Sequence, residues 1–367
     1  MDPQVTHDVT AAALAAYDMV IDVRSPAEFA EDHLPGAVNL PVLSDAERAE
    51  VGTVYVQDSR FRARRMGAAY VARNIARHLE TTLAEREGGF APLIYCWRGG
   101  MRSNAMATVL GQVGWRTRVL EGGYRTYRRH VTAGLYDGTL THRVVLLEGH
   151  TGTAKTELLG RLAQRGIQVL DLEGLAAHRG SLFGGFSDRP QPSQKLFESQ
   201  LLSALNALNP ARPTVIEAES SKIGERMIPP ALWTRLDAAP CIELVAEPAA
   251  RAQYLVQAYQ DIIANRAAME RAFGRLPIHP SPARMAAWRA MADAGQFADL
   301  ALALMTLHYD PAYARGRKKH PRRLIQTVAL TPCDPKSQDA AADAIARAIS
   351  ALDAEGAPED FPAPDER

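Results

Sequence analysis

Short apolar runs, each closed by polar residues or glycine, recur in the first third of the chain. The runs at 18–23 (DMVIDV) and 91–96 (APLIYC) have the length of strands that are buried on both faces, and a third run at 117–123 (TRVLEGG) ends in two glycines. Apolar residues at helical spacing lie between the first two runs. Strands that alternate with helices predict a parallel α/β sheet, with its chemistry at the carboxyl ends of the strands.

A second series begins after residues 125–143, a segment without sustained periodicity. The run at 144–148 (VVLLE) starts it, and a helix is expected from Lys155. The pattern predicts further strands at 167–172, 214–219, 241–247 and 325–330, and further helices at 194–208, around 248–307 and at 337–352.

The length of 367 residues exceeds the usual size of a single core, so two domains are expected. We place an N-terminal parallel-sheet domain at residues 1–135 and a second α/β domain at residues 136–352. Residues 353–367 are acidic and contain prolines, which predicts a disordered tail.

Composition excludes several classes of protein. The 42 basic and 42 acidic residues cancel, so any contact with nucleic acid must come from local patches. Three cysteines without a CxxC pair argue against a disulfide framework and a structural zinc site. With no secretory leader and no stretch of about 18 apolar residues, we expect a cytoplasmic protein without a membrane partner.

A cysteine follows the second strand directly, in the segment CWRGGMRS at 96–103. Two glycines and a following helix would turn backbone N–H groups toward the sulfur, which lowers the pKa of a thiol and binds an anion beside it. A buried structural cysteine is the alternative. We predict Cys96 as the nucleophile and an anion loop of Trp97, Arg98, Gly99, Gly100, Met101, Arg102 and Ser103.

This segment resembles the rhodanese family, as do IDVRSPAEF at 21–29, HLPGAVNLP at 33–41 and EGGYRTYR at 121–128. In that family a loop cysteine carries sulfur, and Cys96 stands at the matching position. Small rhodaneses have CxxGxRS, one residue shorter, and the spacing here also matches cysteine phosphatases. Tyr95 stands where a phosphatase has histidine, which argues against that alternative.

The segment GHTGTAKT follows a predicted strand and opens a predicted helix, the context in which G-x-x-x-x-G-K-[ST] forms a phosphate-binding P-loop. Ala154 replaces the usual second glycine, which raises doubt about efficient nucleotide hydrolysis more than about diphosphate binding. The predicted phosphate-binding residues are Gly149, His150, Thr151, Gly152, Thr153, Ala154, Lys155 and Thr156, the last as a possible ligand of Mg²⁺.

Two acidic residues lie on one face of the strand predicted at 214–219. Glu217 and Glu219 are candidates for binding Mg²⁺ or for acid–base work, and ion pairs with arginines are an equal alternative. The segment 308–323 mixes tyrosines with basic residues, a pattern that suits RNA phosphates and unpaired bases, although a solvated basic surface would give the same pattern. The candidate tRNA contacts are Tyr309, Tyr313, Arg315, Arg317, Lys318 and Lys319.

Taken together, a rhodanese-like domain, a P-loop domain and the later segments HRGSLFGG, QPSQKLFES, VIEAESSKIG and HYDPAY resemble the tRNA 2-selenouridine synthase family. The resemblance implies a transferase that replaces the sulfur of wobble 2-thiouridine in tRNA by selenium. It implies selenophosphate and geranyl diphosphate as co-substrates, Cys96 as the selenium-handling residue, and a selenophosphate-producing enzyme as a candidate partner.

Two other classes remain open. One is a thiosulfate sulfurtransferase or cysteine phosphatase with an accessory nucleotide-binding domain, which would turn over thiosulfate or aryl phosphate without RNA. The other is a nucleotide-dependent kinase-like or switch protein, which would bind ATP or GTP at the P-loop.

Overall fold

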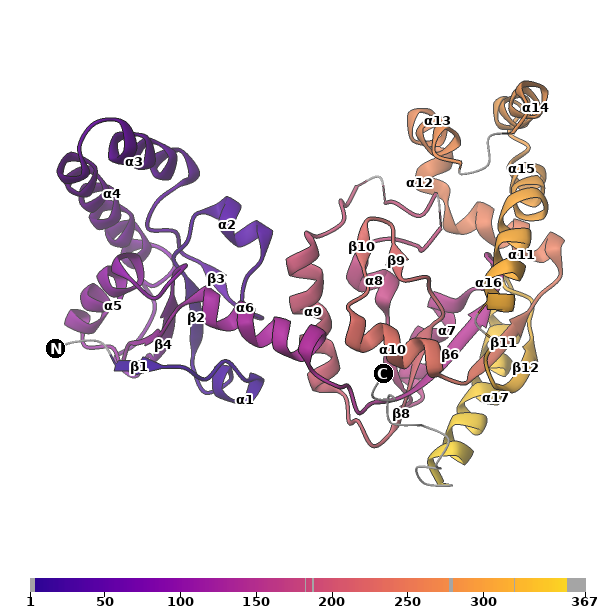
Figure 1. Cartoon of the computed structure of the whole chain (residues 1–367), viewed down its shortest axis with the longest axis horizontal. Coiled ribbons are helices and arrows are strands. Elements are labelled where there is room, and N and C mark those ends of the chain that lie inside the picture. Colours follow the sequence, from indigo (N-terminus) through magenta and orange to yellow (C-terminus); the bar gives the residue numbers. More distant parts are fainter. Residues whose placement is uncertain (1–3, 182, 187, 277–279, 320, 355–367) are drawn as a thin grey trace. The chain divides into compact units, whose positions relative to one another are not determined.

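The computed structural model describes residues 4–181, 183–186, 188–276, 280–319 and 321–354. The chain divides into two compact units (Figure 1). The first comprises residues 1–137 and 193–206, and the second comprises residues 138–192 and 207–367. The helix predicted at 194–208 therefore groups with the first unit, although it follows the P-loop in the sequence.

The first unit contains a five-stranded sheet in the order β1-β5-β4-β2-β3, and all its paired strands are parallel, as predicted. The strands are β1 (Gln4–Thr6), β2 (Met19–Asp22), β3 (Val38–Asn39), β4 (Pro92–Tyr95) and β5 (Arg118–Leu120). The helices are α1 (Ala11–Leu14), α2 (Pro26–Glu31), α3 (Asp45–Gln57), α4 (Arg60–Glu80), α5 (Met101–Val113), α6 (Tyr124–Thr132), the π-helix η1 (Ala133–Asp137) and α9 (Gln194–Ala207).

Buried polar contacts hold α9 in the first unit. Glu198 on α9 is 1% exposed and accepts a hydrogen bond from the Tyr136 hydroxyl at 2.6 Å. It also forms an ion pair with Arg128 of α6. Because a buried carboxylate needs such partners, this pairing fixes which face of α9 turns inward.

The second unit contains a parallel sheet in the order β12-β11-β6-β8-β7, the arrangement of a P-loop α/β domain. Its strands are β6 (Arg143–Gly149), β7 (Gln168–Leu170), β8 (Pro213–Glu217), β11 (Cys241–Val245) and β12 (Leu324–Ala329), with β9 (Lys222–Ile223) and β10 (Arg226–Met227) as a separate antiparallel pair. Its helices are α7 (Lys155–Gln164), α8 (Leu172–Ala176), α10 (Pro230–Ala238), α11 (Pro248–Ala258), α12 (Gln260–Ile263), α13 (Arg266–Gly274), α14 (Pro282–Asp293), α15 (Phe297–Leu304), the π-helix η2 (Met305–Tyr309), α16 (Asp310–Lys319) and α17 (Pro335–Ala354).

Each sheet carries its loop of interest on a central strand. All seven residues of β6 are buried, and the P-loop leaves its carboxyl end. All four residues of β4 are buried, and the cysteine loop leaves its end. In parallel sheets buried on both faces, reactive groups lie at the carboxyl ends of the strands. Both loops lie at such ends, as the sequence predicted.

Three boundaries differ from the prediction. Strand β8 ends at Glu217, so Glu219 lies beyond the strand rather than on its face. The segment from Asp310 to Lys319 is helix α16. Helix α17 continues to Ala354, and Asp353 accepts a hydrogen bond from Arg143 at 3.2 Å, while residues 355–367 of the predicted tail lie outside the described part.

Candidate functional site

Cys96 lies between strand β4 and helix α5, in the loop that the sequence predicted. Helix α5 begins at Met101, and its N-cap, Gly100, supplies no capping side chain. The N-cap therefore leaves the first N–H groups of the helix open to another acceptor, which suits an anion at this end. Met101 is 75% exposed and Arg98 is exposed, whereas Cys96 is only 3% exposed.

The sulfur of Cys96 is surrounded by hydrogen-bond donors. The N–H of Gly100 donates to Sγ at 3.3 Å, and the hydroxyl oxygen of Ser103 lies 3.2 Å from Sγ. Burial raises the pKa of the thiol, but the Ser103 hydroxyl and the N–H groups of Ser103, Arg98 and Gly100 outweigh burial and bring the pKa below its usual value. Cys96 is therefore prepared to react as a thiolate.

Two glycines allow the loop to close on the turn between β5 and α6. Gly99 has φ +66°, and a Cβ there would lie 2.7 Å from the carbonyl oxygen of Leu120. Gly123 has φ +57°, and a Cβ there would clash with the carbonyl oxygen of Cys96. The N–H of Tyr124 donates to that same carbonyl at 2.8 Å. The EGGYRTYR segment thus supports the cysteine loop through backbone contacts that admit no side chain.

Arg102 is held by a residue that sequence reasoning missed. Its Nη1 lies 2.8 Å from Oε2 of Glu28 on α2, and Arg48 of α3 lies 3.2 Å from the same oxygen. Although burial raises the pKa of Glu28, its bonds to Arg102 bring that pKa below the usual value. Trp97 stacks on Tyr124, with ring centroids 5.2 Å apart. Glu28 stands in the rhodanese-like SPAEF motif, so the motif was visible but the role of the glutamate was not.

The P-loop connects β6 to α7 and is ordered by its own backbone. Nζ of Lys155 donates to the carbonyl oxygen of Gly149 at 3.0 Å, and the hydroxyl of Thr153 donates to the carbonyl oxygen of His150 at 2.8 Å. Ala154 caps α7 with a left-handed backbone (φ +57°), the conformation that glycine normally supplies, and its side chain is buried. The replacement of glycine by alanine has therefore kept the loop conformation.

A buried arginine braces the outer side of the P-loop. Arg251 on α11 is 3% exposed, and its Nε donates to the carbonyl oxygen of Thr151 at 2.9 Å. Its Nη2 lies 2.7 Å from Oδ1 of Asp310, and Nδ1 of His150 lies 3.0 Å from the same oxygen. Burial lowers the pKa of His150 below its usual value, despite the nearby Asp310 carboxylate. Sequence reasoning missed Arg251 and Asp310, although Asp310 stands in the HYDPAY segment.

Carboxyl groups gather on the inner side of the P-loop. The Thr156 hydroxyl donates to Oε2 of Glu173 at 3.0 Å, and the N–H of Glu173 donates to Oε1 of Glu217 at 2.7 Å. Burial raises the pKa of Glu217 well above its usual range. Burial, followed by the charge of Glu173, raises the pKa of Glu219 to about 8. Within the described part of the chain, no group of three or more His, Cys, Asp and Glu side chains is arranged to hold a metal ion.

The residues predicted to contact tRNA take several places in the second unit. Tyr309 lines an apolar pocket, and the ring of Tyr313 lies 4.3 Å from the ring of His150. Arg317 forms ion pairs with Glu243 and Glu148. Arg315 is exposed, and the side chains of Lys318 and Lys319 lie outside the described part. Of the four residues whose side chains are described, Arg315 is the one on the surface, while the other three pack or pair within the unit.

No helix in the described residues is long and apolar enough to cross a membrane. Cys241 and Cys333 are free thiols, and burial raises the pKa of both, to about 11 for Cys241. Neither has the low thiol pKa found at Cys96.

Two family models match the chain. Residues 6–130 match the rhodanese-like domain, and residues 142–276 match the tRNA 2-selenouridine synthase AAA domain. The first match contains the cysteine loop, and the second contains the P-loop together with residues 193–206, which group with the first unit.

The curated relatives that match this chain share one name, tRNA 2-selenouridine synthase. The relative from Nitrosomonas europaea is 36% identical over 239 residues, which covers 64% of this chain and 62% of that protein, so the chain spans slightly less than two thirds of its length. The relative from Salmonella arizonae is 36% identical over 69% of this chain and 71% of that protein. The relative from Verminephrobacter eiseniae is 33% identical over 83% of this chain and 91% of that protein. With a cysteine loop in the first unit, a P-loop in the second and relatives that match up to 83% of its length, the chain belongs to the tRNA 2-selenouridine synthase family.

Proposed function

We propose that this chain replaces the sulfur of 2-thiouridine at the wobble position of tRNA by selenium from selenophosphate. The proposal rests on one observation. This chain combines two sites, namely a thiol with a lowered pKa in an anion-binding loop and a P-loop, in a member of this family. The first suits a chalcogen attached to phosphate, and the second suits a diphosphate.

The proposed route begins with alkylation of the tRNA sulfur by geranyl diphosphate. A thiocarbonyl sulfur leaves poorly as sulfide, whereas an alkylated sulfur leaves as a thiol. The C–O bond of geranyl diphosphate breaks, its electron pair stays with diphosphate, and the sulfur binds the allylic carbon. Lys155 would stabilise the charge that develops on the departing diphosphate.

Selenium then replaces the geranylated sulfur. Selenium attacks C2 of the base, geranylthiol leaves, and water takes the phosphoryl group of selenophosphate to give phosphate. Selenium stays at the selenide level throughout this exchange, so Cys96 would direct it to C2 without forming a selenosulfide, while Arg98 and the loop N–H groups hold the phosphate. Arg102 would add positive charge from the position in which Glu28 holds it.

Mg²⁺ is part of the proposal at the P-loop. The oxygens of Thr156 and Glu173 lie 3.0 Å apart beside Lys155, and hydroxyl and carboxylate oxygens are donors that Mg²⁺ accepts together with phosphate oxygens. Thr156 and Glu173 would hold the ion, which would neutralise charge on the diphosphate. Glu217 is committed to the N–H of Glu173 and would act by positioning that residue.

The tRNA contact is proposed for the exposed side of α16, where Arg315 lies, together with Lys318 and Lys319 of the basic sequence. Tyr309 and Tyr313 are engaged within the unit, so base stacking by these rings is not part of the proposal. Selenophosphate would reach the enzyme from the protein that produces it.

Nucleoside mass spectrometry of 2-thiouridine tRNA tests the proposal. Wild type, Cys96→Ala and Lys155→Ala would each be incubated with selenophosphate, with geranyl diphosphate, or with both. We expect 2-selenouridine from wild type with both co-substrates, S-geranylated tRNA but no 2-selenouridine from Cys96→Ala, and neither product from Lys155→Ala. A wild type that turns over thiosulfate or aryl phosphate and leaves the tRNA unchanged would refute the proposal.

A further inference from the structure

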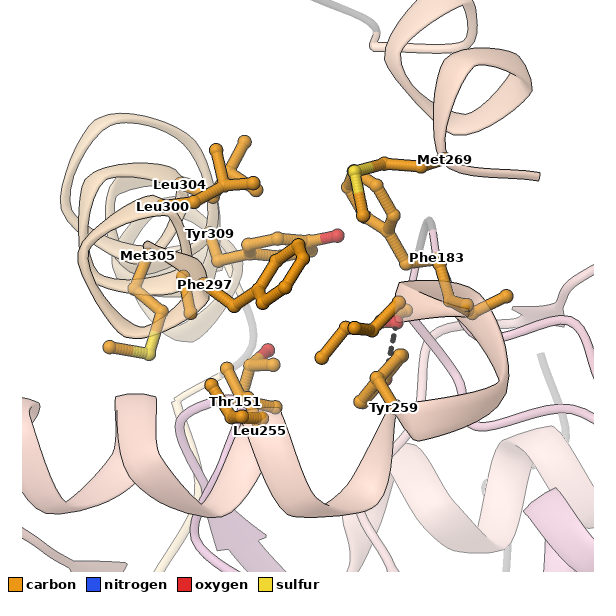
Figure 2. Close-up of a pocket in the computed structure, with 15 residues that line it drawn as sticks. Thr151, Phe183, Leu255, Tyr259, Met269, Phe297, Leu300, Leu304, Met305 and Tyr309 are labelled. Atoms are coloured by element: carbon orange, nitrogen blue, oxygen red, sulfur yellow. Dashed lines mark hydrogen bonds between the residues drawn. The ribbon is translucent and has the colours of Figure 1, made fainter. Parts of the chain in front are cut away.

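An apolar pocket opens beside the P-loop in the second unit. It encloses about 580 Å³ of unfilled space, its open mouth included. Figure 2 shows side chains of α15 and η2 on one side, Met269 and Phe183 on another, and Leu255 and Tyr259 beneath. Apart from Thr151 and Ser181, the lining is apolar or aromatic: Phe183, Leu255, Val256, Tyr259, Ile262, Ile263, Met269, Phe297, Leu300, Ala301, Leu304, Met305 and Tyr309.

The pocket is continuous with the P-loop. Thr151 belongs to the loop and lines the pocket. Leu255 also lines it and packs against the loop, since a Cβ added to Gly152 would lie 3.2 Å from Cγ of Leu255. One turn earlier on the same helix, Arg251 holds the carbonyl oxygen of Thr151. Two successive turns of helix α11 therefore have different roles: the turn of Arg251 supports the P-loop, and the turn of Leu255 forms the floor of the pocket.

The lining does not suit a nucleobase. A base is recognised by donors and acceptors at fixed positions, and the exposed lining here is almost entirely apolar. Two of its few polar groups satisfy each other, because the hydroxyl oxygens of Ser181 and Tyr259 lie 2.7 Å apart. An anion-binding loop that opens onto an apolar pocket instead fits a ligand with a phosphate head and a hydrocarbon tail.

We propose that this pocket binds the hydrocarbon chain of a prenyl diphosphate whose diphosphate lies on the P-loop, and that Met269 limits the length of the chain. The inference rests on the proposed function, which puts a prenyl diphosphate at that loop. Met269 is 4% exposed and lies across the pocket from Thr151 in Figure 2, so it meets the end of a chain that starts at the loop. The faces of Phe297 and Tyr259 would offer their negative π-surfaces to the allylic cation that forms as diphosphate leaves.

Equilibrium binding tests this without any need for turnover. Calorimetry on the full chain would compare inorganic diphosphate with the unreactive thiodiphosphate analogues of dimethylallyl, geranyl and farnesyl groups. We expect the geranyl analogue to bind at least about tenfold more tightly than the dimethylallyl analogue, because each buried methylene adds to the affinity.

Two substitutions of Met269 should move the length preference in opposite directions. Met269→Trp should weaken the geranyl analogue at least about tenfold and leave the dimethylallyl analogue within about twofold, since a short chain does not reach this wall. Met269→Ala should instead improve farnesyl relative to geranyl binding. Met291→Ala is the matched control, because Met291 packs on the same hydrophobic cluster but does not line the pocket. Because Met269→Trp could unfold the helices around it, Met269→Ala also tests the inference independently.

The outcomes separate this inference from the function on which it rests. If inorganic diphosphate binds in a Lys155-dependent manner but the prenyl chains add no affinity, the pocket assignment is wrong and the P-loop assignment stands. If diphosphate and its prenyl analogues do not bind while ATP or GTP does, the proposed role of the P-loop fails. Chain-length preferences of Met269→Ala that equal those of Met291→Ala would refute the role of Met269.

Discussion

The cysteine loop and the P-loop are two solutions to one problem. Each follows a fully buried parallel strand and opens a helix whose N-cap has no capping side chain. In the cysteine loop the helix N-terminus serves an anion that belongs to the protein, the Cys96 thiolate, whose pKa is lowered by hydrogen bonds. In the P-loop Lys155 bonds to the loop backbone, and the anion must come from a ligand. The same arrangement, a helix without a capping side chain after a buried strand, thus prepares a nucleophile in one unit and a receptor in the other.

The charged residues around the two loops also differ. Near the cysteine loop, Glu28 pairs with two arginines, which limits the negative charge around the thiolate. Beside the P-loop, burial raises the pKa of both Glu173 and Glu219, and the charge of Glu173 adds to the shift at Glu219. A Glu219 carboxyl that resists ionisation would repel the proposed diphosphate less than a charged one.

Removal of Cys96 should have the largest effect and separate the two loops. Cys96→Ala should lower the rate of 2-selenouridine formation by roughly 10³-fold or more, because no other group in the loop can replace the thiol in directing selenium. Its affinity for inorganic diphosphate should stay unchanged. Cys333→Ala, which removes a thiol with a raised pKa, is the control for both measurements. Full selenation by Cys96→Ala would show that the thiol has no chemical role.

The converse change is Lys155→Ala. Loss of a charged hydrogen-bond donor should weaken diphosphate binding by roughly tenfold to a hundredfold, as measured by calorimetry. The alkylation rate of Cys96 should not change. Lys336→Ala removes an exposed lysine from α17 and should leave diphosphate affinity at the wild-type value. Equal loss of diphosphate affinity in both variants would mean that Lys155 is not the specific ligand.

Ser103→Ala sharpens the comparison at the thiol. The Ser103 hydroxyl lies 3.2 Å from Sγ of Cys96 and 3.1 Å from the carbonyl oxygen of Gly100. If it donates to the sulfur, its loss raises the pKa of Cys96, and the alkylation midpoint moves to higher pH. Since the thiolate fraction below the pKa falls tenfold per unit, we expect alkylation at pH 7 to slow by roughly threefold to tenfold. Cys241, with its pKa raised to about 11, should stay unreactive. An unchanged midpoint would show that the hydroxyl serves Gly100 instead.

The two loops could be predicted from sequence because each is a contiguous motif whose spacing fixes its backbone. Their supports could not, because they come from residues far apart in the chain. Glu28 lies 74 positions before Arg102, and Asp310 lies 160 positions after His150. No local sequence pattern indicates a contact between residues so far apart in the chain. Composition was also ambiguous for α16: the mixture of tyrosines and arginines indicated an RNA surface, but Tyr313 packs on His150, and Arg317 pairs with Glu243.

The smallest expected effect concerns the residue in which the P-loop departs from its usual pattern. Among the described residues, Ala154 and Ala177 are the non-glycine residues with positive φ, at +57° and +47°. A left-handed alanine costs roughly 1–2 kcal/mol, while glycine costs about 0.5–1 kcal/mol through the greater entropy of the unfolded chain. Glycine at either position should therefore raise the free energy of unfolding by up to about 1.5 kcal/mol. Urea denaturation measures this gain. Diphosphate affinity should rise by roughly twofold to threefold, or ~0.5 kcal/mol, in Ala154→Gly but not in Ala177→Gly. Ala154 stands in the P-loop as the N-cap of α7, whereas Ala177 ends α8. Equal affinities in the two variants would show that the methyl does not crowd the ligand.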